Sequence, residues 1–421
     1  MKKILLIPSY YYLSNPIYIA MKELLDEDFE FIYFFTKDST CIKLNLENIS
    51  YELVGKKFDK YVEIDFDPFW VTKLSVNNNL SNLGLINLIL RLKNNILYFF
   101  NIRKYIKHFV EKINRISPDY IVLTSDMTFS YRIIKRYFPT IKIIIIQPCF
   151  LDFRDKKLKK FSILEKIGNI LLGNLYYPKQ SYFGLESKND KLLLFDDKFM
   201  DFYKNKRENI YKIINPFFSK LNQEIASLNK NNIKKLLFKS ISINPSKPII
   251  ILFASDYTTI HGNEVQMYIE NTYINLIKKY YQSFNFIIKN HPRAGIKNFD
   301  VHFKGYKEVF FLQNELSYNE LLAIGNLNIS INSNASLESI ICGMPTINFL
   351  PLDLQNNEHF KWLSYYGATE ANTFKDIDIL LRKFNKDMNY FNEKVESGRR
   401  KLVDNQTKCK EKLLKAFSNE D

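Results

Sequence analysis

The chain has 421 residues, of which 46% are hydrophobic and 15% aromatic, so it can bury more than one core and is not a disordered protein. Its formal net charge of +15 favours polyanions, nucleotides or an anionic membrane surface as partners, but no recognisable nucleic-acid-binding motif accompanies the charge. The four cysteines are far apart and form no C-x-x-C pair, which argues against a zinc site and against a disulfide framework. These features favour a reduced, cytoplasmic protein without nucleic-acid partners.

Two apolar segments in the N-terminal half are not expected to cross a membrane. Residues 1–7 begin like a signal peptide, but Pro8 ends the apolar run too early, so residues 3–7 are predicted to form the first strand. Residues 83–100 carry Arg91 and Lys93 near their centre and are too polar to span a bilayer. No transmembrane segment is therefore expected.

Short β-branched runs alternate with longer helical patterns along the chain, which is typical of strand–helix–strand units and a mainly parallel sheet. The first series of predicted strands covers residues 3–7, 30–36, 119–124 and 142–147. Their almost continuous hydrophobicity is typical of strands that helices cover on both faces.

A second series with the same alternation begins after the turn-rich residues 244–246. It is predicted as strand 248–254, helix 264–281, strands 284–289 and 308–312, helix 318–324, strand 327–331, helix 337–341 and strand 346–350. The sequence therefore predicts an α/β protein with two Rossmann-like doubly wound domains and a charged, helical C-terminal tail.

Two stretches fit neither sheet. Residues 81–113 are predicted to form a long helical segment, and residues 154–177 combine a basic run with apolar positions at helical spacing. The second stretch has the pattern of an amphipathic helix that lies on an anionic bilayer. The alternative is an ordinary surface helix packed on the first domain.

The second predicted domain carries a first group of candidate binding residues, Lys289, His291, Pro292 and Arg293, directly after a strand. In parallel α/β sheets the carboxyl ends of the strands face the ligand crevice, so polar residues at that end are functional candidates. A histidine fixed by the following proline, between a lysine and an arginine, is suited to donating hydrogen bonds to a phosphate. The alternative is a surface turn whose charges have no ligand.

A second group lies where the strand at residues 327–331 runs into a helix through small polar residues. Ser333 or Asn334 can cap that helix, and its free backbone N–H groups with the positive end of the helix dipole form an anion site. The hydroxyls of Ser333 and Ser336 would add donors, and Glu338 is placed to accept hydrogen bonds from a ribose. The alternative is helix capping without any ligand.

These two groups carry a resemblance to a known family over about residues 248–350. The matching residues are His291, Pro292, Ser333, Ser336, Glu338, Cys342, Gly343 and Pro345. They resemble the C-terminal half of bacterial surface-polysaccharide glycosyltransferases of the GT-B fold. The pattern is most similar to the enzymes that use CMP-activated acidic sugars, the polysialyltransferases and Kdo transferases of capsule assembly, whose His-Pro and Ser/Thr-pair motifs hold the CMP phosphate. CDP-glycerol-using polymerases and UDP-GlcNAc 2-epimerases share similar elements.

The resemblance implies roles for three regions: acceptor binding by residues 1–240, nucleotide-sugar binding by residues 241–375, and a helical tail at residues 376–421. It implies metal-independent, inverting transfer of a sugar such as sialic acid or Kdo to an oligosaccharide or lipid-linked glycan, without a cofactor. Such an enzyme would work in the cytoplasm, at the inner face of the membrane. The predicted nucleotide-binding residues are Lys289, His291, Pro292, Arg293, Ser333, Asn334, Ser336 and Glu338.

Glycosyl transfer requires neutralisation of the leaving phosphate and deprotonation of the acceptor hydroxyl. We assign the first task to His291 together with the capped helix. The predicted base is Asp126, which follows a strand of the first domain; the alternative is that it caps the next helix. Asp152 and Glu23 are weaker candidates for the base.

Two further features concern substrate and metal. His261 lies in a predicted loop and is a candidate contact for donor or acceptor. Asp65 and Asp67 match the letters of a D-x-D motif, but Pro68 follows directly and no metal site is expected.

Other functions stay open at this point. A nucleotide-sugar 2-epimerase would turn over a UDP-sugar without any acceptor, and a CDP-glycerol-type phosphotransferase is a further enzymatic alternative. A non-catalytic basic scaffold on a membrane would show no saturable nucleotide binding.

Overall fold

The computed structural model describes most of the chain. The described residues are 1–8, 11–36, 60–64, 102–126, 128–148, 170, 184–240, 244–255, 258–290, 296, 299–312, 315–331, 333–351, 354, 361–403 and 406–418. For residues 11–14, 35–36, 61–64, 238–240, 258–261 and 406 the description covers the backbone alone. These residues form two compact units, residues 1–213 with 410–421 and residues 214–409.

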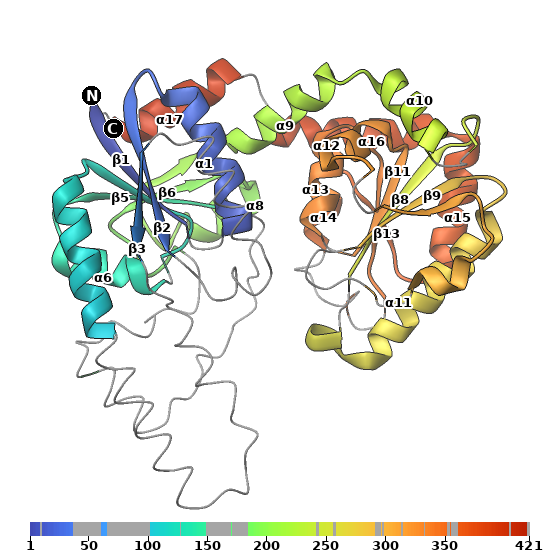
Figure 1. The fold of residues 1–421 in the computed structure, drawn as a ribbon, viewed down its shortest axis with the longest axis horizontal. Coiled ribbons are helices and arrows are strands. Elements are labelled where there is room, and N and C mark those ends of the chain that lie inside the picture. Colours follow the sequence, from blue (N-terminus) through green and yellow to red (C-terminus); the bar gives the residue numbers. More distant parts are fainter. Residues whose placement is uncertain are drawn as a thin grey trace, which may run out of the picture. The chain divides into compact units, whose positions relative to one another are not determined.

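The first unit is built around a parallel sheet of seven described strands (Figure 1). Its elements are β1 (Lys2–Ile7), α1 (Tyr11–Leu25), β2 (Phe29–Thr36), β3 (Tyr61–Ile64), β4 (Tyr120–Leu123), α6 (Phe129–Tyr137), β5 (Lys142–Ile146), β6 (Lys191–Leu194), α8 (Asp197–Tyr203), β7 (Ile210–Lys212) and α17 (Gln406–Phe417). The strand order is β3-β2-β1-β4-β5-β6-β7. The direction of winding therefore reverses between β1 and β4, which is the switch point of a doubly wound sheet.

The second unit repeats this plan with a parallel sheet of six described strands in the order β10-β9-β8-β11-β12-β13. Its elements are α9 (Pro216–Ser227), α10 (Lys230–Ser240), β8 (Ile249–Ala254), α11 (Thr258–Tyr280), β9 (Asn285–Asn290), the 3₁₀ turn η1 (Phe299–Phe303), β10 (Val309–Phe311), α12 (Tyr318–Ile324), β11 (Leu327–Ser330), α13 (Asn334–Ile341), β12 (Thr346–Phe349), α14 (Trp362–Tyr365), β13 (Thr369–Ala371), α15 (Phe374–Lys386) and α16 (Met388–Leu402). The switch point of this sheet lies between β8 and β11.

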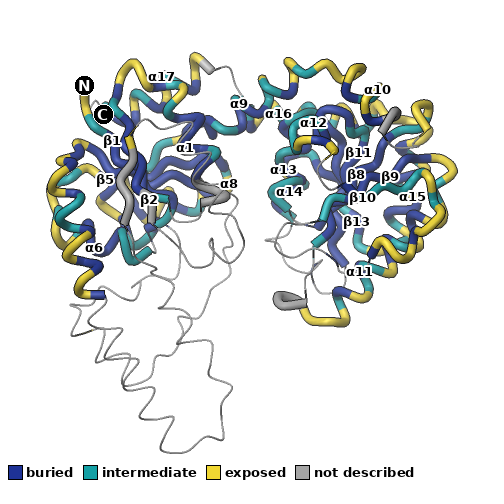
Figure 2. The backbone as a smooth tube through the Cα atoms, in the orientation of Figure 1, coloured by how far each residue is buried: buried dark blue, intermediate teal, exposed yellow. Residues whose placement is uncertain are grey.

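Both sheets are buried as the sequence predicts. All six residues of β8 and the last four of β5 are buried, because helices cover both faces of the sheet. Figure 2 shows buried backbone concentrated in the strands and exposed residues on the outer helices. The prediction of an α/β protein with two doubly wound domains and C-terminal helices is thus confirmed.

The boundaries between the units differ from the predicted ones at residues 240 and 375. Helices α9 and α10 pack on α12, so they belong to the second unit although they precede its first strand. The predicted tail is divided: α15 and α16 pack in the second unit, whereas the C-terminal part of α17 belongs to the first. There the ring of Phe417 contacts that of Tyr120 at 5.3 Å, which fixes α17 against β4.

Several sequence predictions fall on residues that the structure does not describe. They concern Asp65, Asp67, Asp152, most of residues 81–113, and the amphipathic segment 154–177 apart from the exposed Ile170. Within the described ranges, no helix is long and apolar enough to cross a membrane.

Candidate functional site

The candidate site lies at the carboxyl ends of the central strands in the second unit. Register places Ala254 of β8 beside Asn290 of β9, and Leu252 of β8 beside Ile329 of β11. The carboxyl ends of β9, β8 and β11 therefore meet at one edge, and α13 starts there. Ligands of doubly wound sheets bind at this switch point.

Helix α13 is defined by signals at both of its ends. The Ser333 hydroxyl caps it by accepting the backbone N–H of Ala335 at 3.2 Å, as predicted. At the other end Gly343 has φ 78°, and the N–H of Met344 bonds back to the Ser339 carbonyl at 2.8 Å. This left-handed glycine ends the helix in a Schellman turn. Because α13 begins just after the carboxyl end of β11, the positive end of its dipole points at the switch point.

Glu338 lies about one turn into α13, and its carboxylate accepts a hydrogen bond from the hydroxyl of Tyr318, the first residue of α12. Both side chains are half-buried. Burial raises the pKa of Glu338 to about 7, and the Tyr318 hydrogen bond opposes this shift. Burial, followed by the charge of Glu338, raises the pKa of Tyr318 well above its usual value, so Tyr318 is the donor in this pair.

The C-terminal end of α13 is held by Arg399 from α16. Its Nε donates to the Ile341 carbonyl at 3.0 Å, and its Nη2 donates to Oδ1 of Asn222 in α9 at 2.8 Å. Burial raises the pKa of the neighbouring Cys342, which stays a neutral thiol. These contacts fix α13, and therefore Glu338, relative to α9 and α16.

The structure gives Ser336 an internal position. Its side chain is fully buried, and its hydroxyl forms a hydrogen bond with that of Ser330 at the end of β11. Sequence reasoning predicted a donor for phosphate at Ser336, but the helical turn after Ser333 directs this hydroxyl toward the strand. Asn334, the first residue of α13, is half-buried.

The predicted group that contains His291 begins at the end of β9. Lys289 and Asn290 are the last two residues of this strand, and both are half-buried. Oδ1 of Asn290 is buried and has no hydrogen-bond partner among the described residues. His291, Pro292 and Arg293 lie outside the described residues, so their predicted roles are not tested.

His261 is part of a helix in this structure and not of a loop as predicted. It lies in α11 next to Gly262, whose φ of 85° interrupts the helix. Only the backbone of His261 is described, so its predicted contact with substrate is not tested.

The predicted base of the first unit, Asp126, is fully buried after β4. Its Oδ1 accepts the backbone N–H of Gly184 at 2.8 Å, and its Oδ2 accepts that of Ser187 at 2.9 Å. Burial raises the pKa of Asp126, and these two hydrogen bonds oppose the shift. The observed environment is that of a carboxylate that fixes the turn at residues 184–187 against β4.

A buried network continues from that turn. Arg207 donates to the carbonyls of Gly184 and Asp190 and to the Ser187 hydroxyl, the last at 3.1 Å. Asp190 in turn accepts hydrogen bonds from Tyr131 at 2.8 Å and from Lys135 at 3.0 Å. The charges in this part of the first unit are therefore already partnered within the chain.

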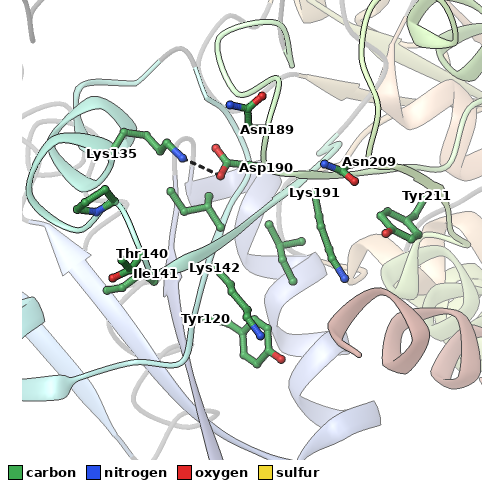
Figure 3. A pocket seen from close by; sticks show the side chains of 13 residues that line it. Tyr120, Lys135, Thr140, Ile141, Lys142, Asn189, Asp190, Lys191, Asn209 and Tyr211 are labelled. Carbon is green, nitrogen blue, oxygen red and sulfur yellow. Dashed lines mark hydrogen bonds and ion pairs between the residues drawn. The ribbon is translucent and has the colours of Figure 1, made fainter. Parts of the chain in front are cut away.

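A pocket of about 530 Å³ lies at the amino ends of β4 to β7, the opposite edge of the first sheet from Asp126 (Figure 3). Three lysines line it, and each already has a contact within the chain. Lys135 pairs with Asp190, Lys142 lies 5.6 Å from the centre of the Tyr120 ring, and Lys191 donates to the Ser418 carbonyl at 2.7 Å. We assign no ligand to this pocket.

The similarity of the chain to known proteins is structural. No protein-family model matches it, and no curated protein matches it in sequence. Its fold is similar to that of a UDP-GlcNAc 2-epimerase from Neisseria meningitidis bound to UDP-GlcNAc, with a TM-score of 0.60, 13% identity and 99% of each chain covered. The 2-epimerase of Methanocaldococcus jannaschii gives a TM-score of 0.53 and 13% identity over 99% of this chain and 100% of that one.

A glycosyltransferase from Rickettsia africae is also similar, with a TM-score of 0.56 and 12% identity over 100% of this chain and 99% of that one. At such low identities these matches show the fold, which is the two-domain Rossmann-like GT-B fold along the whole chain. Two of these three structures are UDP-GlcNAc 2-epimerases, and none is named as a CMP-sugar transferase. The comparisons therefore support the GT-B part of the sequence resemblance and not its CMP-sugar part.

Sequence reasoning missed two residues that hold the site, Tyr318 and Arg399. The Tyr318 position had a local signal, because Ser317 and Glu320 form a capping box that starts α12 at Tyr318. Arg399 gave no such signal, since its partners Asn222 and Ile341 lie 177 and 58 positions away in the sequence.

Proposed function

We propose that the protein binds a UDP-sugar at the carboxyl edge of the second sheet and epimerises the sugar at C2. The observation that carries the proposal is the half-buried Glu338 beside the start of α13, at the switch point of a fold shared with a 2-epimerase whose structure holds UDP-GlcNAc. The epimerase reading replaces CMP-sugar transfer as the leading hypothesis, because the similar structures favour it.

The site supplies two kinds of groups to such a ligand. The N-terminal end of α13 faces the ligand with its positive dipole and suits the diphosphate, to which His291, the next residue of the sequence after β9, would add a donor. The carboxylate of Glu338 has an oxygen left after its bond with Tyr318, and it suits the neighbouring hydroxyls of a ribose. Together they would anchor the nucleotide part of the ligand.

Inversion at C2 breaks one C–H bond and forms another on the opposite face of the ring. Because no carbonyl group adjoins C2, the electron pair of the broken C–H bond forms a C1–C2 double bond while the C1–O bond to UDP breaks. Inversion is completed when UDP adds back to C1 and a proton from solvent or an acid adds to the other face of C2. Asp126 is enclosed and fully hydrogen-bonded in the described structure, so we do not assign it this proton transfer. The acid and base of the reaction are not assigned to described residues.

The experiment is incubation with UDP-GlcNAc in D₂O without an acceptor, followed by NMR. We expect a second sugar epimer that carries deuterium at C2, and a large loss of turnover in Glu338→Gln. Calorimetric titration with UDP, CDP, CMP and GDP tests which nucleobase the site prefers, and we expect UDP to bind most tightly. Unchanged UDP-GlcNAc, or tighter binding of CMP than of UDP, would refute the epimerase proposal.

A second candidate is glycosyl transfer to a glycan, favoured by the similarity to the Rickettsia glycosyltransferase and by the His291-Pro292 and Cys342-Gly343-x-Pro345 patterns. This reading predicts nucleotide release only when an acceptor is added. It also gives the basic segment 154–177 a role in bringing the enzyme to an anionic membrane with a lipid-linked acceptor. Sedimentation with phosphatidylserine vesicles at low and high salt tests that role.

A further inference from the structure

Tyr318 is fixed by contacts that do not involve α13. The Ser317 backbone N–H donates to Glu320 at 2.8 Å, and Ser317 Oγ accepts the Glu320 N–H at 3.3 Å, which defines the start of α12. The Tyr318 ring packs against that of Phe253, the penultimate residue of β8, with the ring centres 6.0 Å apart. Its hydroxyl therefore occupies a set position at the switch point, to which the Glu338 carboxylate bonds.

The hydrogen bond from Tyr318 holds the Glu338 carboxylate. Among the described residues, Tyr318 is the one group that donates a hydrogen bond to its carboxylate, and no cation forms an ion pair with it. The other titratable group beside it is the neutral thiol of Cys342. Two basic groups from neighbouring helices, Arg399 of α16 and Lys230 of α10, act on that thiol and are not hydrogen-bonded to Glu338.

The ionisation of Glu338 falls in the working pH range. Burial raises its pKa to about 7, and the Tyr318 hydrogen bond acts in the opposite direction. A carboxylate accepts hydrogen bonds at both oxygens, whereas a protonated carboxyl group has less acceptor capacity. Affinity for a ribose that bonds to Glu338 should consequently rise as pH increases through about 7.

We propose that Tyr318 is a positioning residue for nucleotide binding, which holds the Glu338 carboxylate in the orientation that receives the ribose. The inference rests on the proposed nucleotide site. It adds that nucleotide affinity depends on the contact between α12 and α13, which the site alone does not imply. Because Tyr318 belongs to α12 and Glu338 to α13, a shift between these helices would change nucleotide affinity through this hydrogen bond.

The test is the pH dependence of UDP affinity, measured by calorimetry between pH 5.5 and 9 for wild type, Tyr318→Phe and Glu338→Gln. Phenylalanine keeps the ring that packs on Phe253 and removes the hydroxyl. We expect the rise in affinity to move to higher pH by about one unit in Tyr318→Phe, because one charge-assisted hydrogen bond to the carboxylate is lost. Glu338→Gln should remove the rise in affinity that is due to ionisation of Glu338. The titration of the UDP phosphates affects all three proteins equally, so differences between their profiles come from the protein.

Tyr280→Phe is the matched control, since the Tyr280 hydroxyl donates to another carboxylate of the same unit, Asp378, at 2.7 Å. Its pH profile should be that of wild type. The same profile in Tyr318→Phe as in wild type would overturn the inference and leave the nucleotide site standing, whereas absence of UDP binding in wild type would overturn both. If Tyr318→Phe does not fold, a Glu338→Gln profile as steep as that of wild type would still refute the inference.

Discussion

Asp126 in the first unit and Glu338 in the second are two carboxylates placed near the switch points of two similar sheets. Asp126 is fully buried, and each of its oxygens accepts a backbone N–H group, from Gly184 and Ser187. Glu338 is half-buried, and among the described residues its carboxylate receives one hydrogen bond, from the Tyr318 hydroxyl. Both carboxylates follow a strand of their sheet in the sequence, but their hydrogen-bonding environments differ.

The difference indicates which carboxylate can receive a ligand. A carboxylate whose acceptors are used by the backbone stabilises the fold, and removing it leaves buried donors unpaired. A carboxylate with spare acceptor capacity and an exposed side can bind hydroxyl groups of a substrate. We therefore expect substitutions at Asp126 to affect stability first, and substitutions at Glu338 to affect ligand binding first.

The largest effect is expected for Asp126→Ala. It leaves the Gly184 and Ser187 amides without their acceptor and removes a charge near the buried Arg207, so the free energy of unfolding should fall by about 3–5 kcal/mol. Thermal and denaturant unfolding measure this loss. Asp119→Ala is the control, because Asp119 also accepts a backbone N–H, that of Lys3 at 2.7 Å, but is exposed; its loss should be below about 1 kcal/mol.

One result would break the comparison. If Asp126→Asn kept the wild-type melting temperature and UDP affinity but lost turnover, Asp126 would act in catalysis as the sequence first suggested. The structural role would then be the wrong explanation for its burial.

The next effect is on affinity. Glu338→Gln keeps the size of the side chain and replaces a charged acceptor with a neutral one, so UDP affinity should fall by about 10- to 100-fold, or roughly 1.4–2.7 kcal/mol. Calorimetry at pH 8 measures it, where the carboxylate is mostly ionised because its pKa is about 7. The melting temperature should not fall, since the substitution removes a partly buried charge; unchanged affinity would place the ribose elsewhere.

Much of the fold follows from local sequence. Strands such as β5 and β8 are continuous apolar runs and were predicted within one or two residues. Strands β7 and β13 are three residues long, with the sequences IYK and TEA, and they carry no periodic signal. They form because a neighbouring strand supplies their hydrogen-bond partners, which is information from tertiary structure.

The candidate site also has features that the local sequence predicts and features that depend on distant residues. The Ser333 cap and the Gly343 terminus depend on neighbouring residues and could be predicted. The partner of Glu338 is 20 positions away on another helix, and the amides that enclose Asp126 are 58 and 61 positions away. A strand–carboxylate pattern therefore identifies where a residue lies on the sheet but not whether its oxygens are already used.

A smaller effect is expected from the helix caps of the two units. Thr128 caps α6 in the first unit and Ser333 caps α13 in the second, each accepting a backbone N–H at 3.2 Å. Thr128→Ala and Ser333→Ala should each reduce the free energy of unfolding by about 1 kcal/mol. Only Ser333→Ala should also weaken UDP binding, which calorimetry of both variants would show. Equal UDP affinities in the two variants would remove the α13 terminus from the site.

The smallest effect is expected from chelation. Because we propose that the α13 terminus and His291 supply the positive groups for the phosphates, UDP affinity and turnover should be the same in excess EDTA as in its absence. The measurement is made after dialysis against EDTA, with readdition of Mg²⁺ or Mn²⁺ as the control. Turnover that is lost on chelation and restored by the metal would contradict the prediction. It would bring Asp65 and Asp67 of the first unit back as candidate ligands, and a carboxylate of that unit would then take part in the chemistry.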